Sequence, residues 1–212
     1  MHRLTQLSVR VWLDRHQQLH GWQAKSRVIM ARVFPDGDYE SWTQCRTLLA
    51  HAKIVLRSIN DTDDEDRLNA ATLWFKCGWF LALRGAYKEA EAMNQRALEA
   101  RENVLGLEHP DTLGSVNNLG SVLSSQGGHE EAEAMHRQVL ETREKALGRE
   151  HPYTLGGVDN LGNVLSRQGK YEEAKVMYRR ALEARVKVLG HEHPDTLANV
   201  IQLALVLFGQ EN

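Results

Sequence analysis

The sequence repeats itself with a constant offset of 42 residues. Residues 88–129 and 130–171 agree at about 26 of 42 positions, far more than unrelated segments would. The positions that share this register are Met93, Met135 and Met177, then Gly106, Gly148 and Gly190, and the His-Pro pairs that begin at His109, His151 and His193. In a repeat array of this kind each unit packs only on its neighbours. The pattern therefore predicts a long binding surface rather than a catalytic centre.

Within each period the pattern predicts a helix, a turn, a second helix and a second turn. Gly85, Gly127 and Gly169 are expected to end the first helices, because glycine adopts the left-handed backbone conformation found there without strain. The first helices are predicted at 67–84, 111–126, 153–168 and 195–208, and the second helices at 88–105, 130–147 and 172–189. No segment shows the sustained alternation of a strand.

The turns between the repeats each contain Glu-His-Pro. The three histidines are predicted to bond carbonyl groups at the end of the preceding helix, while the proline stops that helix. Asp111, Thr112 and Thr154 are the predicted N-terminal caps of the helices that follow.

The chain before the clean repeats has a different composition, since all five tryptophans precede residue 80. We predict an N-terminal helical region at 1–60, an acidic linker and helix start at 61–66, and an array of about three and a half repeats at 67–212. Two apolar stripes at helical spacing support helices in the first region. They are Leu4, Leu7 and Val11, and Leu48, Leu49, Ala52 and Leu56. The sequence Phe-Pro-Asp-Gly-Asp at 34–38 predicts a turn between them.

Composition excludes several classes of function. The net charge of −2 gives no electrostatic reason to expect nucleic acid or an anionic membrane as a partner. No apolar signal segment follows Met1, and the longest apolar stretch, Leu203–Phe208, is too short to cross a bilayer. Cys45 and Cys77 lie in apolar helical patterns and are expected to be buried and reduced. We expect a cytoplasmic protein.

No arrangement of residues predicts enzymatic chemistry, a metal site or a cofactor. His191 and His193 are only two apart, whereas a helical zinc pair needs a spacing of four. The acid pairs recur once per repeat, as solvated helix faces do, and a catalytic pair would occur once. The sequence contains no Gly-x-Ser-x-Gly elbow and no phosphate-binding Gly-x-x-x-x-Gly-Lys loop.

The spacing of Leu119-Gly120, Gly127 and Ala132, with its copies at 42, resembles the tetratricopeptide repeat. That motif places Leu-Gly in its first helix and small residues where helices cross, and its usual period is 34 residues. The longer segments beginning Ala-Leu-Glu-Ala-Arg at 97 and 181 are similar to the repeats of kinesin light chains. They are more similar still to the C-terminal arrays of fungal NLR-like receptor proteins. The resemblance implies an all-α, right-handed superhelical solenoid of antiparallel helix pairs.

The opening residues also resemble the segment that precedes the repeats in those fungal receptors. There a Met-His-Asp motif ends the nucleotide-binding module, and its histidine senses the bound diphosphate. Met1-His2-Arg3 is the matching tripeptide here, with arginine in place of aspartate, and an ordinary start of translation is the alternative interpretation.

The resemblance also implies that the first helices line a concave face that binds a protein segment or an extended peptide. The residues expected on that face are Lys76, Trp79, Asn117, Asn118, Ser121, Ser125, Asp159, Asn160, Asn163, Arg167 and Gln202. Within this set an amide recurs at 118, 160 and 202. Amides both donate and accept, so this series could hold a peptide main chain; the alternative is that they hold the helices together.

The predicted last helix is apolar on nearly every side, which raises the possibility of self-association through it. The sequence therefore predicts a non-catalytic interaction module, the sensor or scaffold arm of an NLR-like receptor. Two alternatives remain. One is an oligomerisation module that associates through its end faces. The other is a cargo adaptor of the kinesin light chain type. Those adaptors have a heptad coil before their repeats, and residues 1–60 show no heptad pattern, which argues against this alternative.

Overall fold

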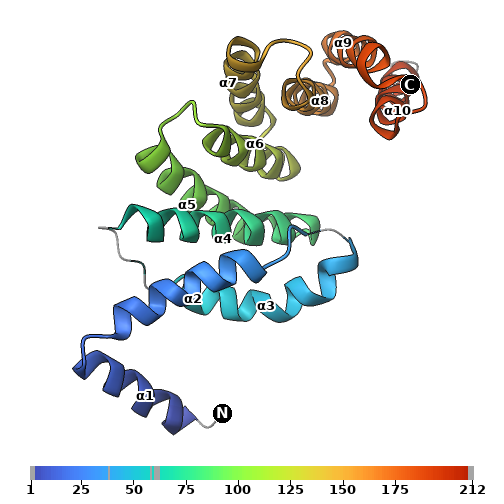
Figure 1. Ribbon diagram of the computed structural model, residues 1–212. Helices are drawn as coiled ribbons and strands as arrows, with labels where there is room; N and C mark the ends of the chain where they lie inside the picture. Colours follow the sequence, from blue (N-terminus) through green and yellow to red (C-terminus); the bar gives the residue numbers. More distant parts are fainter. Residues whose placement is uncertain (1–2, 38, 58, 60–62, 210–212) are drawn as a thin grey trace. The chain divides into compact units, whose positions relative to one another are not determined.

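The computed structural model of the protein describes every residue except 1–2, 38, 58, 60–62 and 210–212. All regular secondary structure in this described part is helical (Figure 1), so the prediction of an all-α fold is confirmed. The chain divides into two compact units, residues 1–112 and 113–212, and each is described by itself.

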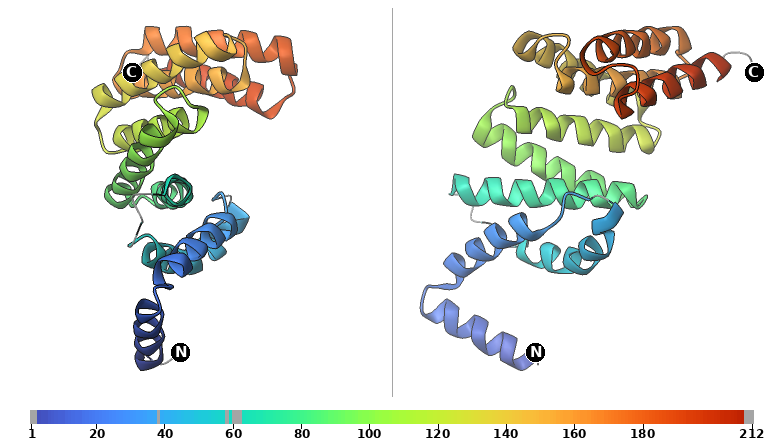
Figure 2. Two further views of the ribbon diagram at one scale, coloured as in Figure 1. Left: turned by 60° about the vertical axis from the view of Figure 1, so that its left-hand side comes forward. Right: turned by 45° about the vertical axis from the view of Figure 1, so that its right-hand side comes forward.

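The first unit contains five α-helices and one short 3₁₀ turn in its described residues. They are α1 (Arg3–Arg15), α2 (Leu19–Val33), η1 (Tyr39–Ser41), α3 (Trp42–Val55), α4 (Asp64–Leu83) and α5 (Tyr87–Leu105). Helices α2 and α3 pack against one side of α4, and α5 runs antiparallel to α4 (Figure 2). The core between them is made of Phe34, Cys45, Ala52, Leu56, Leu73, Trp74, Cys77 and Phe80, among others. Full burial of a large apolar side chain contributes about 1.5–3 kcal/mol, so this core stabilises the unit without any disulfide.

The two cysteines are buried and free, as predicted. Burial raises the pKa of the Cys77 thiol to about 12, an effect that Lys53 partly opposes. A thiol with so high a pKa is protonated at neutral pH and therefore chemically inert.

A buried ion pair that the sequence did not reveal joins α2 to α4. Arg27 Nε donates to Asp66 Oδ1 at 2.6 Å, and a second guanidinium nitrogen bonds the other carboxylate oxygen. Both side chains are only 1% exposed. Arg27 also donates to the carbonyl of Val55 in α3, so one residue ties three helices together.

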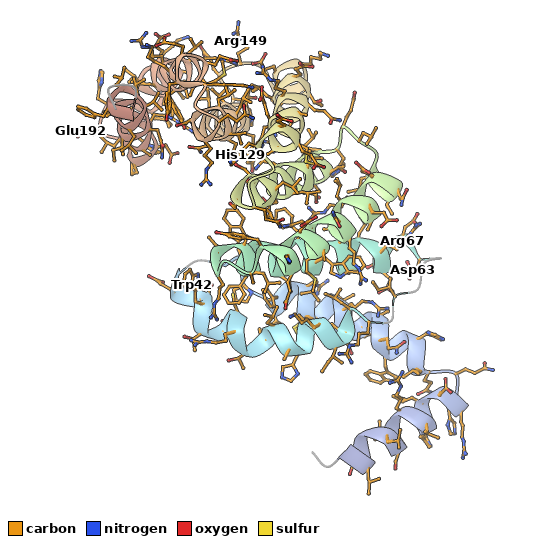
Figure 3. The ribbon with its side chains drawn as sticks, turned by 180° about the vertical axis from the view of Figure 1, so that it is seen from behind. Trp42, Asp63, Arg67, His129, Arg149 and Glu192 are labelled. Carbon is orange, nitrogen blue, oxygen red and sulfur yellow. The ribbon has the colours of Figure 1, made fainter. Side chains whose placement is uncertain are left out.

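The acidic run at 61–66 has a structural role where it is described. Helix α4 begins at Asp64, three residues before the predicted position. Asp63 is its N-cap, and its carboxylate accepts hydrogen bonds from the backbone N–H groups of Glu65 and Asp66. Figure 3 shows Asp63 and Arg67 at this end of the helix. The negative charges thus meet the positive end of the helix dipole, as predicted.

The second unit contains the rest of the repeats. Its helices are α6 (Pro110–Ser125), which begins in the first unit, α7 (His129–Leu147), α8 (Pro152–Arg167), α9 (Tyr171–Leu189) and α10 (Pro194–Gly209). Helix α8 packs between α7 and α9, and α10 packs on α9. The core between them includes Leu140, Val158, Leu161, Leu165, Ala174, Tyr178, Ala181 and Val206.

The predicted bounds of the repeat helices agree with the observed bounds to within three residues, and the glycines act as expected. Gly85, Gly127 and Gly169 have φ of 74°, 95° and 77°. After each of them a backbone N–H bonds back to a carbonyl in the last turn of the helix, for example Lys170 N to Leu165 O at 2.9 Å. This arrangement satisfies carbonyls that the helix itself leaves unpaired.

The predicted roles of the turn residues are wrong. His109, His151 and His193 do not bond carbonyls of the preceding helix; the Nδ1 of each accepts the backbone N–H two residues later at 3.2 Å. The histidines are therefore N-caps of the following helices, and each proline is the first helical residue, where its missing N–H costs nothing. Asp111, Thr112 and Thr154 lie inside the helices and are not caps. Imidazole was overlooked because Ser, Thr, Asp and Asn dominate N-cap statistics.

The stripe of Leu4, Leu7 and Val11 does lie on a helix, α1, but these side chains are 66%, 58% and 42% exposed. The Met1-His2-Arg3 tripeptide begins outside the described residues.

Candidate functional site

Six of the predicted surface residues meet in one polar pocket of about 330 Å³ in the second unit. They are Ser121 and Ser125 of α6, Asn160, Asn163 and Arg167 of α8, and Gln202 of α10. Ser124, His136 and Val164 complete the lining. Three successive first helices thus contribute to one surface, which is what the concave-face prediction requires. We call this set of nine residues the polar pocket.

The polar pocket is partly held by its own hydrogen bonds. Asn160 Nδ2 donates to Asn117 Oδ1 at 2.8 Å, which links α8 to α6. The hydroxyls of Ser121 and Ser125 donate to backbone carbonyls one turn earlier in the same helix. These contacts fix the positions of the side chains and still leave each hydroxyl oxygen able to accept.

Arg167 and Gln202 are different, since neither side chain makes a hydrogen bond or ion pair with the described part of the chain. Arg167 is exposed and Gln202 is half-buried. Together they offer a cationic donor and an amide that can donate and accept, at a surface whose other polar groups are largely neutral.

Two other members of the predicted set support the fold. Asp159 accepts hydrogen bonds from Arg185 and from Asn199, both at 2.6 Å, so its charge is neutralised inside a network between α8, α9 and α10. The hydroxyl of Tyr178 donates a hydrogen bond to Asn163 Oδ1, with the two oxygens 2.7 Å apart. Burial, with the charge of Asp159, raises the pKa of Tyr178 to about 12, so the phenol remains a donor at neutral pH.

His136 lines the polar pocket from the second helix α7, a position that the sequence did not suggest. Its side chain is 1% exposed, and its Nδ1 has no hydrogen-bond partner among the described residues. Burial lowers the pKa of His136 to about 4, and the charge of Arg143 adds to the effect. The imidazole is therefore neutral at pH 7.

A sequence signal could have located His136. It lies 42 residues after Asn94 and 42 before Tyr178, and each of these three faces a glycine of the preceding helix. A Cβ added to Gly120 would come within 3.1 Å of His136, and one added to Gly162 within 2.9 Å of Tyr178. The prediction that small residues allow close helix approach at these positions thus has a geometric basis.

Asn118 is placed differently from the prediction. It is only 7% exposed, it lies outside the polar pocket, and its Nδ2 has no partner among the described residues. The amide series therefore has two members, Asn160 and Gln202, that share the pocket.

Lys76 and Trp79 lie on α4 in the first unit, where the turn after α2 uses them. The Lys76 ammonium donates to the carbonyl of Phe34 at 3.0 Å and pairs with Asp36 at 2.9 Å. The Trp79 indole lies against Gly37, where an added Cβ would be 2.8 Å from the ring, and Trp79 is 39% exposed. Lys76 thus has an intramolecular role.

Among the described residues no group of three or more His, Cys, Asp or Glu side chains is placed to hold a metal ion. In the same part of the chain no helix combines the length and the apolar character needed to span a membrane.

Arg149 and Glu192, in two successive turns between repeats, are exposed side chains (Figure 3).

Comparison with known proteins decides the family. The sequence model described as "Tetratricopeptide repeat" matches residues 78–111, 112–153 and 154–195, which together exceed half of the chain. The chain belongs to the tetratricopeptide repeat family. Folds of this family are in general scaffolds for interaction with proteins or peptides rather than enzymes.

A curated relative has the fungal NLR-like character that the resemblance predicted. It is a nucleotide-binding leucine-rich repeat (NLR)-like protein of Hyaloscypha variabilis, 36% identical over 117 residues. The match covers 55% of this chain and 12% of the relative, so this chain corresponds to a small part of that protein's length.

Solved structures share the repeat fold at low sequence identity. A putative kinesin light chain of Podosopora anserina with nearly identical TPR-like repeats has a TM-score of 0.67 at 21% identity, covering 88% of this chain and 86% of that one. BtubC (BKLC) from P. vanneervenii has a TM-score of 0.64 at 20% identity, covering 78% and 65%. The apo form of RapI has a TM-score of 0.61 at 18% identity, covering 87% and 70%. These similarities support the solenoid of helix pairs, whose right-handed superhelix stays a prediction.

Proposed function

We propose that the protein is a non-catalytic recognition module that binds an extended protein segment at the polar pocket. The observation that carries this proposal is the convergence of α6, α8 and α10 on one surface, where the Arg167 and Gln202 side chains make no hydrogen bond or ion pair with the described residues. An extended peptide exposes one N–H and one C=O per residue, and Asn160 and Gln202 can pair with both. Arg167 adds a preference for an acidic side chain, because Asp159 is already neutralised by Arg185.

We further propose that this module is the sensor or scaffold arm of a larger NLR-like receptor. The name of the Hyaloscypha variabilis relative supports this role. In such an arrangement the repeats would respond to a partner while another part of the receptor performs the ATPase chemistry. The cargo-adaptor alternative has only fold similarity behind it, since the kinesin light chain structure is 21% identical.

The test is a binding screen with a library of extended peptides against the purified chain and two double variants. Arg167→Ala/Gln202→Ala removes the two uncommitted pocket side chains. Arg179→Ala/Gln138→Ala makes the same chemical change on exposed positions of α9 and α7. The loss of one charged and one neutral hydrogen bond is expected to lower the affinity for the retained peptides about tenfold or more.

The control variant should bind like the wild type, and far-UV circular dichroism should show equal helicity in all three proteins. If no peptide binds the wild type, or if both double variants lose binding equally, the pocket is not the recognition surface.

A second candidate function is self-association through the C-terminal helix. Ile201, Leu205 and Phe208 of α10 are 58%, 60% and 69% exposed, which favours coverage by another molecule. The mass of the protein in solution as a function of concentration tests this candidate.

A further inference from the structure

A pocket in the first unit is lined by arginines from three different elements. It has a volume of about 480 Å³ and lies between α4, α5 and the residues that follow α3. Arg67 is on α4, Arg96 is on α5, and Arg57 follows the C-cap of α3. Trp74, Glu99 and Asn103 also line it. We call these six residues the arginine pocket.

Two of the three guanidinium groups are not neutralised by any ion pair. Arg57 and Arg96 are exposed, and neither makes a hydrogen bond or ion pair in the described part of the chain. The guanidinium carbon of Arg96 lies 5.7 Å from the centre of the Trp74 ring, and this cation–π contact holds the side chain at the pocket. Arginine side chains are charged at every physiological pH. The arginine pocket therefore contains two permanent positive charges that are open to a ligand.

The third arginine is only partly used by the protein itself. Arg67 lies in the first turn of α4 (Figure 3), where one of its terminal nitrogens bonds Asp64. Its Nε is buried and has no hydrogen-bond partner among the described residues. The Asp64 side chain is 66% exposed, so water screens this ion pair and the pair is weak. An anion in the pocket can therefore share Arg67 with Asp64.

The 42-residue register shows that this unneutralised charge is particular to the first copy. Arg96 corresponds to Gln138 of α7 and to Arg180 of α9. Arg180 pairs with Glu144 of the preceding second helix at 2.5 Å, and its side chain is 21% exposed. Gln138 has no charge. The array thus neutralises the arginine in one later copy and replaces it in the other, which indicates that the charge of Arg96 is not needed for the packing of helix pairs.

The charges fit a phosphate monoester better than a carboxylate. A single arginine can already bind a carboxylate with two parallel hydrogen bonds. A phosphate monoester has three terminal oxygens and a charge of about −1.5 to −2 near pH 7, which matches the two unpaired charges of Arg57 and Arg96. Asn103 adds a neutral amide donor. Glu99 is the only acid among the lining residues and repels any anion, so the affinity is limited but the class of ligand is not changed.

We propose that the arginine pocket binds the phosphate group of a monoester, with Arg57 and Arg96 as the main donors and Arg67 as a third. This proposal does not depend on peptide binding at the polar pocket, which lies in the other unit. A phosphorylated side chain of a protein segment and a small phosphate ester share this chemistry. Two or three charged hydrogen bonds at an open surface give a dissociation constant on the order of 0.1–1 mM.

NMR titration measures this binding through the indole N–H signal of Trp74, the ring that Arg96 covers. The probes are methyl phosphate, a phosphoserine tripeptide with blocked ends, and the same tripeptide without phosphate. Arg57→Gln/Arg96→Gln removes both unpaired charges and gives position 96 the residue found at 138. Arg46→Gln/Arg84→Gln is the matched control, because these arginines are exposed and lie outside the pocket in the same unit. The control should bind methyl phosphate like the wild type, and the pocket variant at least tenfold more weakly.

Glu99→Gln tests the sign of the charge effect. Removal of this acid should tighten the binding of methyl phosphate about threefold or more. Glu40→Gln, which removes an exposed acid outside the pocket, should leave the affinity unchanged. Far-UV circular dichroism should show equal helicity in all these proteins.

The two phosphate probes distinguish the sources of the ligand. A phosphoserine tripeptide that binds at least tenfold more tightly than methyl phosphate identifies a protein segment, and equal affinities identify a small ester. The proposal is overturned if the Trp74 signal does not shift at millimolar phosphate ester, or if the tripeptide binds equally well without its phosphate. Equal weakening in both double variants, or equal effects of Glu99→Gln and Glu40→Gln, overturns it as well.

Discussion

The close approach of helices at the repeated glycine can be tested by replacing Gly162 with alanine. Gly162 lies in the interior of α8, and an added Cβ would be 2.9 Å from Tyr178 Cε1 and 3.0 Å from Cζ. Tyr178 cannot easily move aside, because it is 1% exposed and its hydroxyl is bonded to Asn163. Real Cβ atoms do not approach other atoms so closely, so helix α9 or the ring has to shift.

The same helix offers a matched control. Gly156 is half-exposed, and a Cβ added there would meet nothing within 4 Å. Alanine is favoured over glycine in a helix interior by about 0.8–1 kcal/mol, so Gly156→Ala should stabilise the protein by about that amount. Gly162→Ala has the same helical gain but also an overpacking cost of about 1–3 kcal/mol. The free energy of unfolding should therefore differ between the two variants by about 1–3 kcal/mol, with Gly162→Ala the less stable.

Urea denaturation followed by far-UV circular dichroism measures this difference. All five tryptophans lie before residue 80, in the first unit, so tryptophan fluorescence reports separately on a unit that neither substitution touches. In a Tyr178→Ala background the ring is gone, and Gly162→Ala should become stabilising, as Gly156→Ala is. If Gly162→Ala is as stable as Gly156→Ala in the otherwise wild-type chain, the glycine has no packing role and our reasoning fails.

Two other predictions concern buried ionisable side chains. His136 has a pKa of about 4 in the folded state against 6.5 for the ordinary side chain, so its contribution to stability is complete above pH 6.5 and is lost as the pH falls towards 4. About 2 kcal/mol of the free energy of unfolding should be lost by pH 5. In His136→Asn, which has the residue found at position 94, the thermal midpoint should change less between pH 7 and pH 5. Identical pH profiles of the two proteins would contradict the buried neutral state of His136. Asp66→Ala leaves Arg27 buried without its counter-charge and should cost about 3–5 kcal/mol in urea denaturation, whereas Arg27→Met/Asp66→Leu, which removes both charges, should cost clearly less.

The sequence alone determined the fold class and the helix boundaries of the repeats. Both could be predicted because the 42-residue repeat shows the same signals in each of its copies. These signals are a left-handed glycine such as Gly127, a helix-starting proline such as Pro152, and a small residue such as Gly162 at a helix crossing. The glycine and proline signals are local preferences of the backbone, and they do not depend on which distant residues come together. Gly162 is recognised only because it recurs, since its role depends on the Tyr178 ring of the next helix. The register also predicted one shared face for Asn160, Arg167 and Gln202, and all three line the polar pocket; their role in binding a partner stays a prediction.

Only the tertiary structure decided which of the polar residues are available to a partner. The sequence predicted Asp159 and Lys76 as surface charges. In the structure Asp159 pairs with Arg185. Lys76 pairs with Asp36 and donates to a backbone carbonyl. The buried Arg27–Asp66 pair joins residues 39 apart in sequence, and no local pattern encodes such a contact. His136 reaches the polar pocket because α7 packs closely on Gly120. Hydrogen bonding and burial depend on neighbours from other helices. A periodic sequence therefore predicts which face of a helix a side chain lies on, but not whether that side chain already bonds another residue of the chain.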